Sequence, residues 1–323
     1  MRELTYAEAM AEGIVEAMEA NDRIVLFGGG FGGLTPQRAS YGVIRERFGE
    51  RISEVPISEL GFCGIAIGAA MTGMRPLVSI GTGSFIYEAW PQVVNEAAVA
   101  YYGSGGELEV PVIFHFLAGL RGAGAVQHSS SPQAMLWNAP GLQIAVPASP
   151  ADAKGLMKHA LLRGRAPTVM VAHNYIQGVR GPVPDGDGEV PFGVAEVKRA
   201  GTDVTIVATS IMVHRALEAA ESLAQSGISA EVVDPRTLVP LDKDTILSSV
   251  AKTGRVVVAD ETPRSCGVAA EISAIIAEEG FQSLKAPVKR VTTPDVPVPY
   301  SKAEEDFITP KAEDIVSAAK SLV

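Results

Sequence analysis

Short apolar runs alternate with longer amphipathic stretches along the first half of the chain. The runs are bounded by glycine, proline and small polar residues, which is the pattern of buried strands joined by helices. The helices are expected to begin near Thr5, Ser58, Glu88 and Ser149, where a capping residue or an acidic first turn precedes an apolar period. The expected strands are 23–27, 52–57, 76–80, 111–116, 143–146 and 168–171. This alternation predicts a mainly parallel sheet covered on both faces.

The same alternation resumes after a turn-rich segment, 181–193, that is poor in large apolar residues and is expected to be a linker. In the second half the expected strands are 204–208, 230–233, 255–259 and 288–291, and the expected helices are 213–225, 242–250, 267–278 and 311–322. We therefore predict an α/β protein with two doubly wound domains, residues 1–180 and residues 194–323.

Composition and charge narrow the class of partner. The 323 residues are 47% hydrophobic and 20% charged, with a net charge of -10, which argues against nucleic acid or an anionic membrane as the main partner. The N-terminus does not resemble a signal peptide, and no apolar run reaches the roughly 18 residues that span a bilayer. Cys63 and Cys266 lie far apart, without metal-binding spacing. We expect a cytoplasmic protein.

One carboxylate lies at the start of an unusually small and apolar helix. Ser58 can cap this helix, Glu59 falls in its first turn, and the residues from 61 to 72 are almost all small or apolar. The simpler interpretation is that Glu59 complements the helix dipole. The alternative is a carboxyl group that exchanges a proton with a ligand in a low-dielectric site.

Two other patterns point only weakly to a site. Residues 28–33 match G-x-G-x-x-G after a strand, but Pro36 interrupts the segment and the helix and acidic ribose ligand of a dinucleotide fold are poorly formed. The sequence has no G-x-S-x-G elbow, and neither cysteine lies beside an evident base, which disfavours a hydrolase.

Three chemically useful side chains each follow an expected strand of the first domain: Glu59, Phe85 and His128. The carboxyl ends of parallel strands meet at one edge, so these residues are expected to lie along it. A carboxylate, an aromatic ring and an imidazole suit a planar nitrogen-containing ligand and an acid–base step. Each residue taken alone has a simpler interpretation: Phe85 packs in the core, and His128 forms a hydrogen bond within its loop.

Several segments together resemble a known family, and they occur in its order along nearly the whole chain. They are ISELGFCGIAIGAAMTG, FIYEAWPQVVNEAAVAYYGSGG, AVQHSSSPQ, PGLQIAVPASPADAKGLM, VVDPRTLVPLD, GRVVVADE and GVAAEI. The sequence is similar to the β-subunit of thiamine-diphosphate-dependent 2-oxoacid dehydrogenases, the first components of the pyruvate, branched-chain 2-oxoacid and acetoin dehydrogenase complexes. The resemblance implies a pyrimidine-binding domain followed by a transketolase C-terminal-like domain.

The resemblance also assigns roles to residues. Glu59 matches the carboxylate that hydrogen-bonds the cofactor's aminopyrimidine ring, and Phe85 matches the aromatic that stacks on that ring. His128 matches the histidine that orients substrate and assists acyl transfer to lipoamide. Ile57 and Leu60 are expected to line the pyrimidine pocket, and Glu88, one turn after Phe85, matches a further cofactor-binding position.

The other half of the cofactor is expected on another chain. In the family, Mg and diphosphate are held by G-D-G and a later asparagine of the α-subunit, whose oxygens suit a hard cation. Gly186-Asp187-Gly188 falls in the linker, and no asparagine follows Asn174, so we interpret it as a chance match. The resemblance therefore implies an α2β2 assembly with shared active sites.

Departures from the family pattern concern four places. Gly29 and Gly30 stand where an acidic pair is usual, and Glu88 and Pro91 replace a glutamine and an aspartate. Glycines also replace two aromatics, at Gly81 and Gly83, which is expected to widen the pocket. In the family a monovalent cation is held largely by backbone carbonyls, at positions that match Val112, Ala160, Leu161, Arg163 and Arg165. The last two positions are usually aspartate and asparagine, and this departure counts against a cation site here.

These observations leave three functions. The first is decarboxylation of a 2-oxoacid with acyl transfer to the lipoyl group of a second component. The second is an acetoin dehydrogenase, or a stand-alone enzyme that forms or cleaves acyloins. The third, from a different class, is a structural or regulatory subunit without catalysis. Acidic residues 304–306 are interpreted as a solvated face, with docking of a basic acyltransferase segment as the alternative.

Overall fold

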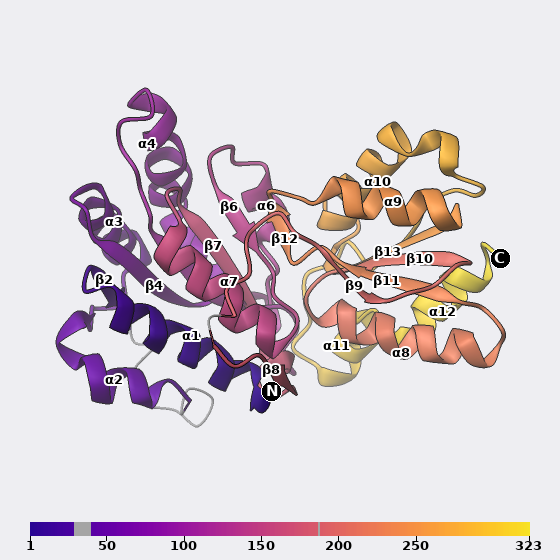
Figure 1. The fold of residues 1–323 in the computed structure, drawn as a ribbon, viewed down its shortest axis with the longest axis horizontal. Coiled ribbons are helices and arrows are strands. Elements are labelled where there is room, and N and C mark those ends of the chain that lie inside the picture. Colours follow the sequence, from indigo (N-terminus) through magenta and orange to yellow (C-terminus); the bar gives the residue numbers. More distant parts are fainter. Residues whose placement is uncertain (29–39, 187) are drawn as a thin grey trace.

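The computed structural model describes residues 1–28, 40–186 and 188–323. The chain forms two α/β units, each a sheet between layers of helices (Figure 1). This is the predicted architecture. The glycine pairs at 29–30 and 32–33, Pro36 and Asp187 lie outside the described residues.

The first unit is built on a seven-stranded sheet whose inner strands run parallel. Across the sheet the strands are β12 (Thr237–Val239), β6 (Gln143–Ala145), β7 (Thr168–His173), β5 (Ile113–Ala118), β4 (Arg75–Thr82), β2 (Ile24–Phe27) and β3 (Ile52–Ser53). One face carries α1 (Tyr6–Ala20), α2 (Gly42–Phe48) and α7 (Pro150–Arg163), whose apolar side chains form one core with the sheet. The other face carries α3 (Glu59–Met71), α4 (Ala98–Gly103) and α6 (Gln133–Trp137).

The second unit has a five-stranded sheet, parallel except at one edge. Its strands in order are β14 (Lys289–Thr293), β13 (Val256–Pro263), β10 (Val204–Ala208), β11 (Ala230–Asp234) and the antiparallel edge strand β9 (Glu196–Arg199). Helices α8 (Ile211–Gln225) and α12 (Ala312–Lys320) share a core with one face. Helices α9 (Lys243–Thr253) and α10 (Val268–Glu279) cover the other, and their core is continuous with that of the first unit.

Two strand pairings cross the domain boundaries that the sequence predicted. β8 (Arg180–Val183) begins where the linker was expected and pairs antiparallel with β1 (Arg2–Thr5). β12, which follows β11 in the chain, crosses back and extends the first sheet beside β6. The domain boundaries at residues 180 and 194 stay a prediction. Each of the two pairings brings a segment from beyond residue 180 or 194 against the first unit.

The helix expected to begin at Glu88 forms differently. A 3-10 turn, η4 (Gly83–Ala89), is followed by a π-helical turn, η5 (Pro91–Ala97), and then by α4. Pro91 lacks an N–H, so it fits only the first turn of a helix and interrupts any regular hydrogen-bonding pattern that continues from residue 88. The strand expected at 52–57 is only two residues long and ends before Pro56.

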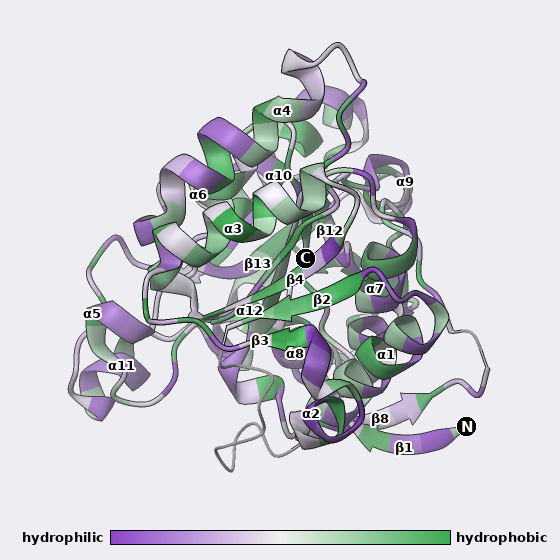
Figure 2. Ribbon diagram, turned by 90° about the vertical axis from the view of Figure 1, so that its left-hand side faces the viewer, coloured by the Kyte–Doolittle hydropathy of each residue, from purple (hydrophilic) through white to green (hydrophobic). Residues whose placement is uncertain are grey.

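Short helices complete the chain. They are η3 (Gly49–Arg51), α5 (Ala125–His128), η6 (Asn174–Ile176), η7 (Phe281–Ser283) and α11 (Lys302–Ile308). Hydrophobic residues concentrate on strands such as β2 and β3, and α3 also carries hydrophobic residues on its outer side (Figure 2). Among the described helices, none combines the length and apolar character needed to cross a membrane.

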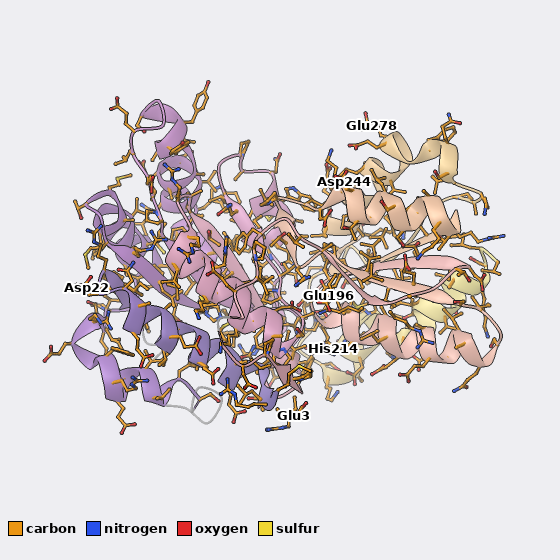
Figure 3. All side chains as sticks on the ribbon, in the orientation of Figure 1. Glu3, Asp22, Glu196, His214, Asp244 and Glu278 are labelled. Atoms are coloured by element: carbon orange, nitrogen blue, oxygen red, sulfur yellow. The ribbon has the colours of Figure 1, made fainter. Side chains whose placement is uncertain are left out.

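Charged side chains mostly project outward, as Glu3, Asp22, Asp244 and Glu278 do (Figure 3). Glu196 and His214 instead lie where the two units meet. The His214 ring nitrogen Nε2 contacts the backbone oxygen of Ala148 at 2.8 Å, which ties α8 to the first unit.

Candidate functional site

The three predicted site residues follow neighbouring parts of one sheet edge. Glu59 begins α3 after β3, Phe85 lies in η4 directly after β4, and His128 ends α5 after β5. Strands β3, β2, β4 and β5 are adjacent and parallel, so their carboxyl ends meet at the same edge. The structure thus brings the three residues to the common edge that the sequence predicted.

Glu59 occupies the first turn of α3 because Ser58 caps the helix. The Ser58 side chain accepts a hydrogen bond from the Gly61 N–H at 3.3 Å. Glu59 is half-buried, and Cys63, one turn later, is fully buried. Burial, and secondly the Glu59 carboxylate, raise the pKa of the Cys63 thiol to about 12. Glu59 therefore faces an apolar helix core on one side and solvent on the other, and Ile57 and Leu60 beside it are exposed.

Phe85 and His128 are in direct contact. Their ring centroids lie 5.6 Å apart with an interplanar angle of 68°, an edge-to-face arrangement. The Thr82 hydroxyl donates to the backbone oxygen of His128 at 3.2 Å, and the Ser84 hydroxyl donates to the backbone oxygen of Gln127. Phe85 is half-buried and His128 is exposed, so the pair presents an aromatic face and an imidazole to a ligand approaching from outside.

Among the described residues, the cavity that adjoins this loop does not take in the three residues. A cavity of about 400 Å³ lies just beyond His128, lined by Ser129–Ser131 and, from the second unit, by Glu261 and Cys266. Glu59, Phe85 and His128 are not among its lining residues. The site edge is therefore open, and it needs a covering surface before water can be excluded from it. Glu88, one 3-10 turn after Phe85, is also exposed at this edge.

The carbonyls predicted to hold a monovalent cation do not fit one. Arg75 donates from its guanidinium to the backbone oxygens of Leu161, Ala160 (3.4 Å) and Gly164 (2.6 Å) at the end of α7. The other carbonyls with protein donors are those of Val112, which accepts from the Thr168 N–H at 2.8 Å, and Arg165, which accepts from the Val110 N–H at 3.1 Å. A guanidinium already supplies the positive charge there, so the prediction of an ion at these carbonyls is not supported.

The glycines that were expected to widen the pocket have a different role. A Cβ on Gly83 would lie 2.8 Å from the backbone oxygen of Ser130 and 3.0 Å from Pro132, so the space is already filled. Gly81 has a φ of 90° and lies where the pairing of β4 and β5 shifts register. Gly83 permits close backbone packing and Gly81 permits a positive φ, and the prediction of a wider pocket at Gly83 is wrong.

Comparison with known proteins gives the family. A model described as the transketolase pyrimidine binding domain matches residues 2–175, and one described as the transketolase C-terminal domain matches residues 193–315. The β-subunit of an acetoin:2,6-dichlorophenolindophenol oxidoreductase from Cupriavidus necator is 40% identical over 99% of this chain and 97% of its own. A mitochondrial pyruvate dehydrogenase E1 β-2 subunit from Oryza sativa is 39% identical over 99% and 86%. The chain belongs to the β-subunit family of thiamine-diphosphate-dependent 2-oxoacid dehydrogenases.

Other similarities agree with this membership. The 2-oxoisovalerate dehydrogenase β-subunit of Bacillus subtilis is 37% identical over 100% of this chain and 99% of its own. A solved structure titled as a split gene transketolase, inactive beta4 tetramer, matches with a TM-score of 0.80 and 26% identity over 99% of this chain and 98% of that one. Members of the family are oxidoreductases that act as heteromers, and the β-subunit names imply an α-subunit partner.

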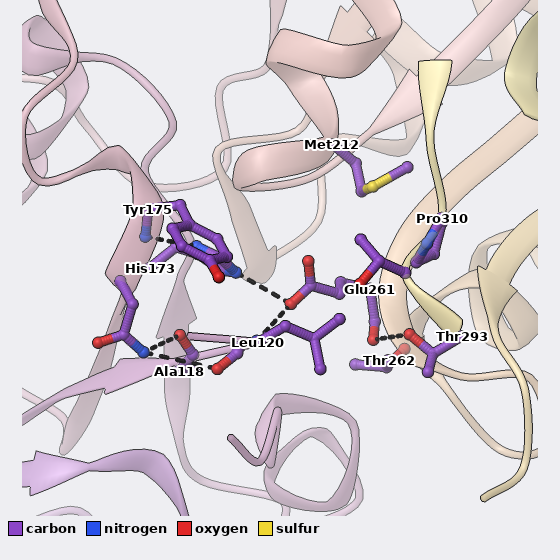
Figure 4. A network of polar contacts seen from close by, with 12 residues as sticks. Ala118, Leu120, His173, Tyr175, Met212, Glu261, Thr262, Thr293 and Pro310 are labelled. Carbon is purple, nitrogen blue, oxygen red and sulfur yellow. Dashed lines mark hydrogen bonds and ion pairs between the residues drawn. The ribbon is translucent and has the colours of Figure 1, made fainter. Parts of the chain in front are cut away.

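A buried polar network binds the loop that leads to His128, and the sequence did not indicate it. Residues 304–306 were interpreted as a solvated face, but Glu305 is only 1% exposed, so that interpretation is wrong for this residue. Glu261, at the end of β13, is also buried and pairs with His173 (Figure 4). The carboxylates in VVVADE and KAEEDF were the available signal, but nothing in their spacing says that they reach the first unit. Among the described residues, no group of three or more His, Cys, Asp or Glu is arranged to hold a metal.

Proposed function

We propose that this β-subunit contributes the pyrimidine half of a thiamine-diphosphate site in a dehydrogenase that decarboxylates a 2-oxoacid and transfers the acyl group to lipoamide. An α-subunit is proposed to hold Mg and the diphosphate, in an α2β2 assembly that works with a lipoyl acyltransferase. The observation that carries the proposal is the grouping of Glu59, Phe85 and His128 at one open sheet edge. The cytoplasmic location stays a prediction.

The residues present fit the pyrimidine ring of the cofactor. Glu59 offers a carboxyl in the first turn of an apolar helix, and a carboxyl can hydrogen-bond a ring nitrogen. Phe85 offers a half-exposed aromatic face for stacking. When bound, thiamine diphosphate supplies the nucleophilic carbon and the electron sink for decarboxylation. Ile57, Leu60 and Glu88 are proposed to complete the contacts to the ring.

In the reaction, Glu59 holds and returns the proton that sets the protonation state of the pyrimidine ring. His128 is proposed to hydrogen-bond the substrate and to move a proton during acyl transfer. Its ring is oriented by Phe85, and its backbone is held by Thr82, so the imidazole is presented in a defined direction. The surrounding water is proposed to be excluded by the α-subunit.

The openness of the edge supports a shared site. Ile57 is 95% exposed, and Leu60 and Ile65 on the outer side of α3 are more than half exposed. Apolar side chains of this size are typical of surfaces that another subunit covers. The monovalent cation expected from the sequence is not carried into the proposal, because Arg75 meets the same carbonyls.

Acetoin is the second candidate substrate. The observation that favours it is that β-subunits named for acetoin oxidation, from Cupriavidus necator at 40% identity and Bacillus subtilis at 37%, match over almost the whole chain. Both candidates use the same three residues. Rates measured with pyruvate, 2-oxoisovalerate and acetoin, each with dichlorophenolindophenol and with lipoamide as acceptor, separate them.

The test of the proposal is Glu59→Gln in the assembled α and β chains. General acid–base groups typically contribute about 10²- to 10⁴-fold, so we expect the rate to fall at least about a hundredfold while assembly is retained. Glu50→Gln is the control, because Glu50 is exposed and lies outside the site edge. A Glu59→Gln enzyme as active as the control would contradict the assignment of this carboxyl and favour a non-catalytic role for the chain.

A further inference from the structure

The loop that leads to His128 has an unusual backbone. Between β5 and α5 the chain passes through positive φ at Gly119 (83°), Gly122 (74°) and Ala123 (61°). Positive φ is unfavourable for alanine, and it turns successive N–H groups away from the positions they have in regular structure. Such a loop keeps one conformation only when other groups hold it.

Glu261 of the second unit holds the beginning of this loop. Its Oε1 accepts the Leu120 N–H at 2.8 Å and contacts His173 Nε2 at 2.9 Å (Figure 4). Burial alone would raise the pKa of Glu261, but His173, Arg215 and the Leu120 N–H outweigh burial and lower it. A Cβ on Gly119 would lie 1.9 Å from His173 Nε2 and 2.7 Å from Glu261 Oε1, so only glycine allows this approach.

Glu305 of α11 holds the middle of the loop. Its Oε1 accepts the Gly122 N–H at 2.6 Å and its Oε2 accepts the Ala123 N–H at 3.0 Å. The Tyr175 hydroxyl lies 3.5 Å from Oε1. Hydrogen bonds from backbone N–H groups to a carboxylate are among the stronger ones in proteins. The two oxygens therefore hold two adjacent peptide units in the conformation that alanine disfavours.

The far end of the loop is held by the first unit. His128 itself is fixed through its backbone by Thr82 and through its ring by Phe85, as described above. The segment from Leu120 to His128 is therefore held at its beginning and middle by two carboxylates of the second unit and at its far end by η4. Removing the carboxylates takes away the first two of these contacts without touching Glu59 or Phe85.

The geometry points to Glu305, supported by Glu261, as a positioning residue that sets where the His128 imidazole lies during acyl transfer. This inference rests on the proposed function, because it acts through the role of His128. The inference also gives the second unit a part in the reaction, although in this scheme that unit contributes no catalytic residue. Glu305 touches neither substrate nor cofactor in this scheme.

The test uses the assembled α and β chains and the best of pyruvate, 2-oxoisovalerate or acetoin, with lipoamide as acceptor. Glu305→Gln replaces one accepting oxygen by an NH₂ group, which cannot accept the second N–H. We expect kcat to fall about tenfold with the KM for the substrate nearly unchanged. Glu304→Gln is the matched control, because Glu304 precedes Glu305 directly and its side chain is exposed. This variant is expected to behave as the wild type.

A double-mutant cycle separates positioning from simple stabilisation. If Glu305 acts through His128, the Glu305→Gln change adds nothing to His128→Ala, whereas a structural role lowers activity to the same degree in both backgrounds. Thermal unfolding of each assembly is recorded beside the kinetics. Should Glu305→Gln fail to fold, Glu305→Asp, which keeps the charge but shortens the reach, takes its place.

The outcomes are distinguishable. Independent, multiplicative losses, or a Glu305→Gln enzyme as active as the control, overturn the inference while leaving the proposed function intact. A His128→Ala enzyme with full activity overturns both the role proposed for His128 and this inference. A loss of kcat that disappears in the His128→Ala background supports it.

Discussion

The contact between Arg75 and the end of α7 gives a stability prediction that also decides the cation question. Arg75 begins β4, is half-buried, and its guanidinium meets the last carbonyls of a helix, where a positive charge is favourable. Burial lowers the pKa of Arg75 while Glu109 opposes this, and the group stays charged at any ordinary pH. The perturbation is Arg75→Met, which keeps the apolar stem and removes the charge and the donors.

The magnitude follows from these contacts. Two of the three hydrogen bonds are short, and each is worth about 1 kcal/mol net in this partly solvated position. The charge at the helix end adds about 0.5 kcal/mol. We therefore expect Arg75→Met to lower the free energy of unfolding by about 2.5 kcal/mol. Arg163→Met is the matched control at the same helix end, because its exposed pair with Glu189 is worth less than about 0.5 kcal/mol.

The assay is urea unfolding of the full-length chain, followed by circular dichroism, in KCl and in choline chloride of equal concentration. For the wild type the midpoints are expected to coincide, because the carbonyls already have a cationic partner. If Arg75→Met lowers the free energy of unfolding no more than Arg163→Met does, the energy assigned to the Arg75 contacts is refuted. A wild type stabilised by KCl but not by choline chloride would refute the replacement of the ion by Arg75.

Two further predictions concern a buried carboxyl and a closely packed glycine. Burial, then the neighbouring Asp152 carboxylate, raise the pKa of Asp234 from 3.8 to about 7, so its folded form binds a proton more tightly than the unfolded chain. Its contribution to stability is present below about pH 4 and is lost as the pH rises to about 7. Urea midpoints measured across that range should therefore fall less in Asp234→Asn than in the wild type. Midpoints that fall equally with pH in the two proteins would count against this. Gly141→Ala places a Cβ 1.9 Å from the Ala98 backbone oxygen at a φ of 103°, and should destabilise the chain by about 3 kcal/mol or more. Gly73→Ala, with a φ of 98° and open space, isolates the conformational cost of about 1–2 kcal/mol, and equal thermal shifts in the two variants would show that the contact is unimportant.

Local signals were enough for the elements that matter most to the site. Thr5 and Ser58 accept backbone N–H groups at the helix starts where the sequence placed them, because capping depends only on nearby residues. The buried strands of both sheets were recognisable because an apolar run bounded by turns has few other uses. The common edge of Glu59, Phe85 and His128 followed from the parallel topology alone.

What the sequence could not give depends on long-range pairing. Strands β1, β8, β9 and β12 are short or polar, and they are strands only because distant partners complete their hydrogen bonds. The burial of Glu305 is of the same kind, because its carboxylate is buried only where the loop of Gly122 and Ala123 presents two N–H groups to it. The sequence by itself determined the fold class, the family and the residues at the sheet edge, since these depend on local pattern and order. Only the tertiary structure decided what holds the His128 loop and what meets the α7 carbonyls, since both depend on groups brought together from distant parts of the chain.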